Sequence, residues 1–338
     1  MTALDSSLSR RRGPARRQVL KILAASAVLP LGIAGLRMFG PQSTFHAWQG
    51  EALGAVASMQ LWHVNAGHAQ RTLARMAAEV RRLEGVFSLY QPDSEISRLN
   101  RDGVLVRASR DMRVVLESAR AMAEASGGAF DPTVQPLWQL YERHFGQAGA
   151  NPSGPRPGAI DAARQLVDYR GIDIEESAVR FAAQGMAVTP NGIAQGYITD
   201  VIADILRNEG FDHVAIELGE TRVLGTHPEG RPWQVGLRDW AGDTGRMIEL
   251  VDESSATSGG YGTVFDPTGT HHHIFDPGTG ISANRLKEVV AVAPRAMDAD
   301  ALGTALFVAG EERAADILAT VSGARAILTR TDGEVIRL

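Results

Sequence analysis

The chain has 338 residues, a net charge of −5, 44% hydrophobic residues and no cysteine. Without cysteine there can be no disulfide, thiolate metal site or cysteine nucleophile. Residues 1–45 hold seven of the basic residues and one of the acidic ones, so the remainder has 27 basic and 38 acidic residues. Such an acidic remainder suits phosphate neutralisation poorly, and we expect no nucleic-acid partner.

The first 45 residues have the features of an export signal. Arg16 and Arg17 precede a moderately apolar stretch at 22–36. A basic head, twin arginines and a short apolar core are typical of a twin-arginine (Tat) signal. The stretch is shorter than the roughly 20 apolar residues of a spanning helix, and an uncleaved anchor is the alternative. We predict a periplasmic protein with a signal at 1–45 and one folded domain at 46–338.

Hydrophobic periodicity predicts the main elements of that domain. Apolar residues recur at helical spacing in three segments, 73–87, 115–123 and 201–206. Short runs rich in β-branched residues predict strands at 213–218, 233–237, 247–251, 288–293 and 324–328. The segment 146–158 is rich in Gly and Pro and predicts a solvent loop. Helices and strands do not alternate strictly, which favours the α+β class.

A further helix is predicted at 298–310, where the sequence reads DADALGTALFVAG. Asp300 and Thr304 are four residues apart, so their side chains share one helix face, which we expect to be exposed above an apolar one. Two short oxygen ligands held in this way suit Mg²⁺. In the alternative interpretation, Asp298 and Asp300 are ordinary acidic residues of a helix's first turn.

Two glycine-rich loops adjoin predicted helices and carry polar groups. Residues 127–138 read GGAFDPTVQPLW, and the Asp-Pro pair predicts a turn with a free carboxylate at Asp131. Residues 191–200 read NGIAQGYITD, where two glycines let the backbone approach a ligand. Each loop taken singly is also compatible with an ordinary turn.

Two more polar loops lie toward the C-terminus. Residues 256–266 read ATSGGYGTVFD, a composition that can hold a phosphate on backbone N–H groups. Residues 271–280 read HHHIFDPGTG. Side chains of adjacent histidines point apart, so we do not expect His271 and His272 to form a zinc site.

The motifs of several common enzyme classes are missing from the sequence. No Gly-x-Gly-x-x-Gly follows a predicted strand, which argues against a nicotinamide dinucleotide site. Neither of the two lysines precedes Ser or Thr, which excludes a P-loop, and no Gly-x-Ser-x-Gly or His-Glu-x-x-His occurs.

With these loops in order, the chain resembles the ApbE family of FAD:protein FMN transferases from about Glu51 to Phe307. The resemblance is carried by EGVFSLYQPDSEISRLNR, GGAFDPTVQPLW, NGIAQGYITD, ELGETRVLG, ATSGGYGT, HHHIFDPGTG and DADALGTALFVAG. It implies an ApbE-like α+β fold with mixed sheets, flanking helices and a flavin site between two lobes. The leader and the GIAQGY variant also resemble the periplasmic NosX branch, which is associated with nitrous-oxide reductase maturation.

The resemblance implies Mg²⁺-dependent transfer of FMN from FAD to a threonine of a target flavoprotein, with release of AMP. Asp300, Thr304 and the carbonyl of Ala194 match metal-ligand positions. His273 matches a general base, expected to have a near-neutral pKa, with a structural turn histidine as the alternative. Tyr90 matches an aromatic residue that stacks on the flavin, or else packs in the core. The remaining positions implied to bind FAD are Asp131, Gly192, Gln195, Glu217, Thr257, Ser258 and Gly259.

The sequence departs from the family's pattern at three places. Ala55 stands where a threonine is usual, Gln195 replaces a lysine near the pyrophosphate, and Gly219-Glu220 replaces Gly-Gly. Three functions therefore stay open: FMN transferase, metal-dependent FAD pyrophosphatase, and a non-catalytic FAD-binding maturation factor for a periplasmic respiratory reductase. The implied acceptor carries an Asp-x-x-Ser/Thr-Gly-Ala-Thr motif, and a membrane-bound respiratory regulator is one candidate.

Overall fold

The computed structural model describes residues 26–28, 43–52, 55–239 and 242–338. The twin arginines and most of the apolar stretch after them lie outside these ranges, as does Gly54 of the N-terminal motif. Within the described residues, every helix is too short or too polar to cross a membrane.

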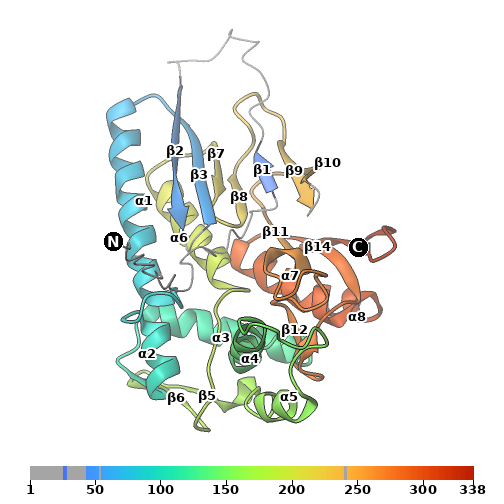
Figure 1. Cartoon of the computed structure of the whole chain (residues 1–338). Coiled ribbons are helices and arrows are strands. Elements are labelled where there is room, and N and C mark those ends of the chain that lie inside the picture. The colour runs from blue at the N-terminus through green and yellow to red at the C-terminus, as the bar shows by residue number, and fades with distance from the viewer. Residues whose placement is uncertain (1–25, 29–42, 53–54, 240–241) are drawn as a thin grey trace, which may run out of the picture.

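An eight-stranded sheet forms the centre of the molecule (Figure 1). Its strands in chain order are β2 (Thr44–Ala52), β3 (Ala55–His63), β7 (Val214–Glu217), β8 (Thr221–Leu224), β11 (Ser254–Gly259), β14 (Leu286–Ala293), β15 (Arg325–Arg330) and β16 (Val335–Arg337). Their order across the sheet is β16-β15-β14-β11-β8-β7-β3-β2. All of these neighbours pair antiparallel, so the expectation of mixed sheets is wrong.

Three smaller sheets surround the large one, and their described pairs are also antiparallel. The first contains β1 (Ser26–Val28), β9 (Trp233–Asp239) and β10 (Gly242–Leu250). The second contains β4 (Val104–Val106), β5 (Ile172–Ile174) and β6 (Ala178–Phe181). The third is the pair β12 (Phe275–Asp276) and β13 (Ile281–Ser282).

Helices cover one face of the large sheet, and β9 and β10 cover the other. The covering helices are α1 (Ala66–Phe87), α6 (Ala194–Asn208) and α7 (Ala296–Ala309). Because side chains alternate along a strand, neighbouring residues of β7 enter different clusters. Ile216 joins the main core with the helices, whereas Ala215 packs with Trp233 and Val235 of β9. Strand β7 is therefore buried on both faces.

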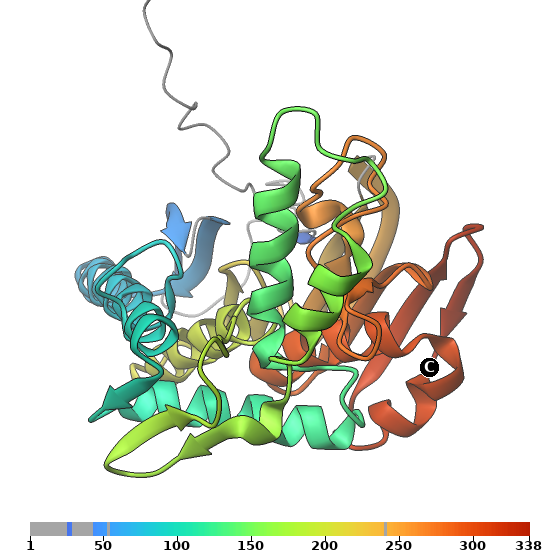
Figure 2. The same ribbon diagram turned by 60° about the horizontal axis from the view of Figure 1, so that its bottom comes forward.

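Helix α8 (Glu311–Leu318) packs on α7 and β15. The remaining helices form a second layer below the sheet in Figure 1. They are α2 (Glu95–Asp102), α3 (Arg110–Ala125), α4 (Gln135–Phe145) and α5 (Pro157–Arg164), with single 3-10 turns η1 (Pro132–Val134), η2 (Tyr169–Gly171) and η3 (Gly260–Gly262). Figure 2 shows α4 beside the loops around β12. Leu137 and Tyr141 of α4 pack on Phe275 there, which fixes one wall of a cleft.

The α+β class is confirmed, and every predicted helix and strand overlaps an observed one. The predicted loop at 146–158 connects α4 and α5, with only its last two residues inside α5. Periodicity missed short elements such as α2 and α8, each of eight residues, because two turns show too few repeats of the pattern. It also missed α4, which begins soon after the Asp-Pro turn.

Candidate active site

A cleft lies between the large sheet with its helices and the layer that contains α4. Its empty space is about 1150 Å³, including the open solvent at its mouth. Ten of the twelve predicted site residues line it: Tyr90, Asp131, Gly192, Gln195, Thr257, Ser258, Gly259, His273, Asp300 and Thr304. Six segments far apart in the sequence thus meet at one place.

Two predicted site residues do not line the cleft. Ala194 is fully buried in the first turn of α6, next to Gln195. Glu217 is buried at the end of β7, where its carboxylate accepts a hydrogen bond from Thr221 Oγ1 at 2.7 Å. Both residues lie beside the cleft lining rather than at its surface.

Asp300 and Thr304 lie one turn apart on α7, as the spacing predicts, but the helix face is not exposed. Helix α7 is buried nearly all round, and only 5% of Asp300 is exposed. Asp300 Oδ2 accepts a hydrogen bond from Gly196 N at 3.1 Å, and burial raises the pKa of the carboxyl to about 7. The expectation of an exposed face is wrong because α7 packs between the large sheet, α6 and α8.

The Thr304 hydroxyl lies close to a second hydroxyl and to the backbone of a glycine. Thr304 Oγ1 is 3.5 Å from Ser258 Oγ of β11. A Cβ added at Gly192 would lie 2.9 Å from Thr304 Oγ1, and one added at Gly303 would lie 2.9 Å from Ser258 Oγ. The backbone therefore approaches these hydroxyls as closely as only glycine allows.

Glu220 lines the cleft and was not among the predicted site residues. It is buried, and its carboxylate accepts a hydrogen bond from the backbone N–H of Thr257. Burial raises its pKa well above the usual value, and the charges of Asp300 and Glu217 add to the effect. The acidic residue in place of glycine was visible in the sequence, but only the fold places it beside Asp300.

Gln195 stands where the resemblance implies a lysine, and it lies against Gly219, the residue before Glu220. Gly219 has φ +99°, and a Cβ there would be 2.4 Å from Gln195 Nε2. Within the described part of the chain, Nε2 is buried with no hydrogen-bond partner. Such an orphaned donor is costly unless a ligand or water satisfies it.

His273 lines the cleft with its Nδ1 turned toward Thr263, whose carbonyl oxygen lies at 3.2 Å. Burial, with a smaller contribution from the charge of His272, lowers the pKa of His273 to about 4. The expected near-neutral pKa is therefore wrong, and the ring is neutral at physiological pH. His271 and His272 direct Nε2 elsewhere, to Pro152 O and Ala283 O.

Among the residues that line the cleft, Asp131 is buried and Tyr90 is exposed. The carboxylate of Asp131 is buried and accepts hydrogen bonds from Thr133 N, Thr133 Oγ1 and Tyr169 N. The expected free carboxylate is thus wrong, because it caps η1 and fixes the turn. Tyr90 is 65% exposed, which excludes core packing and leaves its ring accessible.

The charge of the lining limits the ligands that it can bind. Among the described residues that line the cleft are three carboxyl groups and no lysine or arginine. A phosphate-bearing ligand would be repelled by ionised carboxylates unless a cation lay between them. The Asp300 carboxylate and the Thr304 hydroxyl are hard oxygen donors of the type that Mg²⁺ accepts, so these residues fit that ion.

Fold and cleft together define an α+β protein with a glycine-rich cleft whose lining carries three carboxyl groups. A sequence model of the ApbE family matches residues 53–328, and the chain belongs to this family.

Relatives and solved structures agree with this assignment. The chain is 32% identical over 296 residues to a FAD:protein FMN transferase of Treponema pallidum, covering 77% of this chain and 80% of that protein. It is similar to the flavin transferase ApbE from Vibrio cholerae, with a TM-score of 0.73, 25% identity and coverage of 88% and 97%. The ApbE protein of Thermotoga maritima gives a TM-score of 0.75, 26% identity and coverage of 87% and 97%.

Proposed function

We propose that this protein is an FAD:protein FMN transferase, which moves FMN from FAD to a threonine of a target flavoprotein. Membership of the ApbE family and relatives named for this activity support the reaction class. The observation that carries the proposal is the cleft itself. Ten of the residues matched to the family's site line it, and the lining includes three carboxyl groups, one of them from Glu220.

In the proposed site, Asp300, Thr304 and the backbone carbonyl of Ala194 would hold Mg²⁺. When bound, the ion would supply positive charge that offsets the negative charge of the phosphates. The hydroxyls of Thr257 and Ser258 and the backbone at Gly192 and Gly259 orient the phosphates. Tyr90, exposed at the cleft, stacks on the isoalloxazine ring.

The reaction is a displacement at the FMN phosphorus of FAD. The acceptor threonine Oγ forms a bond to that phosphorus, and the bond to the bridging oxygen breaks. AMP leaves with the bonding electron pair, and FMN stays on the acceptor as a phosphoester. His273 is neutral at physiological pH and takes the proton from the threonine hydroxyl on a ring nitrogen.

A non-catalytic FAD-binding role is the second candidate, and one feature of the cleft favours it. Gln195 removes a positive charge and Glu220 adds an acidic group beside the proposed pyrophosphate position. Both changes reduce stabilisation of charge that develops on the leaving group. The protein would then act as a maturation factor for a periplasmic respiratory reductase, as in the NosX branch.

Incubation of the folded protein with FAD, Mg²⁺ and an acceptor domain bearing an Asp-x-x-Ser/Thr-Gly-Ala-Thr motif separates the candidates. The transferase gives FMN covalently attached to the acceptor, detected as a mass increase that an acceptor lacking the final threonine does not show. An FAD pyrophosphatase releases free FMN and AMP. Bound but unchanged FAD indicates the non-catalytic role and contradicts the transferase.

We further propose that the protein acts in the periplasm after export by the twin-arginine signal. The support is the arrangement of Arg16 and Arg17 before a short, moderately apolar core. Membrane-bound respiratory flavoproteins with domains on that side are candidate acceptors.

A further inference from the structure

Helices α6 and α7 both begin without a side-chain cap from their own flanking residues. The N-cap positions are Ile193 for α6 and Arg295 for α7, and neither makes a side-chain capping bond. The first backbone N–H groups of a helix need acceptors, especially when the helix is buried. The acceptors must therefore come from elsewhere in the fold.

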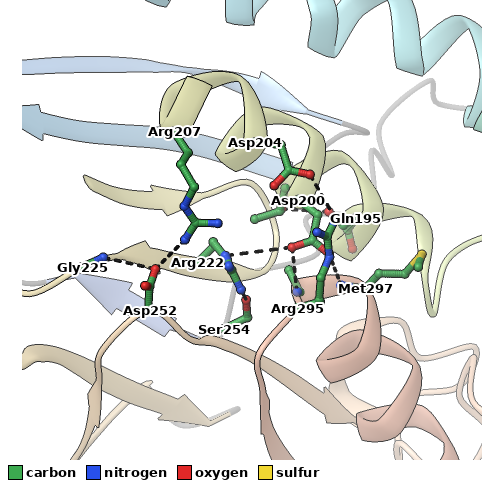
Figure 3. Close-up of polar contacts among 12 residues, drawn as sticks. Gln195, Asp200, Asp204, Arg207, Arg222, Gly225, Asp252, Ser254, Arg295 and Met297 are labelled. Atoms are coloured by element: carbon green, nitrogen blue, oxygen red, sulfur yellow. Dashed lines mark hydrogen bonds and ion pairs between the residues drawn. The ribbon is translucent and has the colours of Figure 1, made fainter. Parts of the chain in front are cut away.

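Each helix supplies the cap of the other. Asp300 of α7 accepts from Gly196 N in the first turn of α6 at 3.1 Å. Asp200 of α6 accepts from Ala296 N at 2.9 Å and Met297 N at 3.0 Å, the first two residues of α7 (Figure 3). Because all three bonds join one helix to the other's first turn, they restrict how far α7 can slide along α6.

Close packing of the two helices strengthens this coupling. A Cβ added at Gly196 would lie 2.3 Å from Ala296 O, so the two first turns are in direct backbone contact. Asp300 lies one turn further along α7 from this contact. A shift of the first turn of α7 would therefore move the carboxylate at Asp300 and the hydroxyl at Thr304 together.

Asp200 is itself held by two arginines. Only 1% of its side chain is exposed; Arg295 Nε lies at 3.3 Å, and Arg222 Nε lies at 4.0 Å (Figure 3). Arg222 is also buried and donates to Ser254 Oγ of β11 at 3.0 Å. Arg295 bridges onward to Asp204, which is half-exposed. A buried carboxylate with this many partners has one available position.

We propose that Asp200 is a positioning residue of the cation site, which fixes Asp300 and Thr304 by capping α7. Asp200 does not line the cleft. The inference rests on the proposed function, because it concerns the site assigned there to Mg²⁺. It assigns a function to a residue that the motif NGIAQGYITD contains but that was not among the predicted site residues.

The test compares Asp200→Asn with Asp204→Asn by titration with Mn²⁺ alone, followed by the electron paramagnetic resonance of free Mn²⁺. Asparagine keeps one acceptor oxygen but presents an NH₂ group to the second backbone N–H. We expect the Kd for Mn²⁺ to rise about tenfold, in the range known for loss of groups that orient metal ligands. Asp204→Asn is the matched control, since it lies one turn away and also contacts Arg295, and its Kd should equal the parent's.

Melting temperatures measured on the same samples separate positioning from stability. An Asp200→Asn protein that melts earlier but binds Mn²⁺ with the parent's Kd would overturn the inference and leave a structural role. If the parent itself fails to bind Mn²⁺, the proposed cation site is wrong and the inference falls with it. The two failures are therefore distinguishable.

A milder variant covers the case in which Asp200→Asn does not fold. Arg295→Gln leaves the buried carboxylate in place and removes its half-exposed partner. The Kd for Mn²⁺ should rise by about threefold relative to Asp204→Asn, because half-exposed ion pairs contribute little. Equal Kd values for these two variants would contradict the positioning role.

Discussion

At the scale of single residues, the Asp300 carboxylate connects the helix framework to the cleft. One oxygen accepts from Gly196 N, and the side chain belongs to the lining. A neutral asparagine can keep the acceptor oxygen for Gly196 while losing the negative charge. The charge and the cap can therefore be separated experimentally.

Asp300→Asn should lower Mg²⁺-dependent FMN transfer by about two orders of magnitude, the size expected when a contact to developing charge is lost. The free energy of unfolding should change by only about 1 kcal/mol, because the cap remains. Initial rates across a Mg²⁺ titration and urea unfolding measure the two effects. Asp298→Asn is the control, because Asp298 lies two residues earlier and outside the lining. Equal rates for both variants would support the alternative, in which Asp298 and Asp300 are ordinary acidic residues of the first turn.

The pKa of His273 gives a pH-dependent contribution to stability. Its folded pKa is about 4, below the usual value of 6.5, so the unfolded chain binds more protons between these values. This contribution is complete above pH 6.5 and is lost as pH falls toward 4. Urea unfolding at a series of pH values should show that His273→Gln loses less stability than the parent over this window. Parallel curves for the two proteins would contradict the burial of a neutral ring.

At the scale of elements, the contact between α6 and α7 explains why glycine occupies position 196. Position 85 in α1 offers the opposite case, since a Cβ there would meet nothing within 4 Å. The same substitution in the two helices therefore separates local helix propensity from tertiary packing.

Gly196→Ala should destabilise the protein by about 1–3 kcal/mol, because the new methyl group meets the backbone of Ala296. Gly85→Ala should stabilise it by about 0.5–1 kcal/mol through the higher helix propensity of alanine. Urea midpoints at a constant m-value provide the comparison. A Gly196→Ala protein as stable as the parent would show that the helices can separate without cost.

At the scale of the whole molecule, charge is distributed unevenly between residues 1–45 and the remainder. Residues 1–45 are basic, whereas residues 46–338 carry a net charge of −11. Because twin-arginine export carries folded proteins, the proposed export predicts that the cleft holds its FAD before the membrane is crossed.

Replacement of Arg16 and Arg17 by lysine should leave the full-length precursor in the cytoplasm, still folded and still able to quench flavin fluorescence on binding FAD. The twin-arginine translocase reads the guanidinium pair, and lysine differs in geometry despite equal charge. Cell fractionation with immunodetection measures the distribution, and a matched Arg10/Arg11 double-lysine variant is the control. Periplasmic double-lysine protein at the parent's level would indicate a general secretory signal or an anchor instead.

The sequence by itself determined several of the main elements and indicated the family. Helical spacing located α1, α3 and α6, and runs of β-branched residues located β7, β9, β10, β14 and β15, because these patterns depend only on neighbours along the chain. The ordered motifs also identified most of the residues that line the cleft.

The tertiary structure alone decided the environment of each group. In the folded chain Asp300 is buried with Glu220 beside it, Tyr169 N donates to the carboxylate of Asp131, the pKa of His273 is lowered, and Asp200 caps the first turn of α7. Several of these properties depend on partners far away in the chain, such as Gly196 for Asp300. Desolvation and capping depend on what surrounds a group in space, and local periodicity carries no information about that.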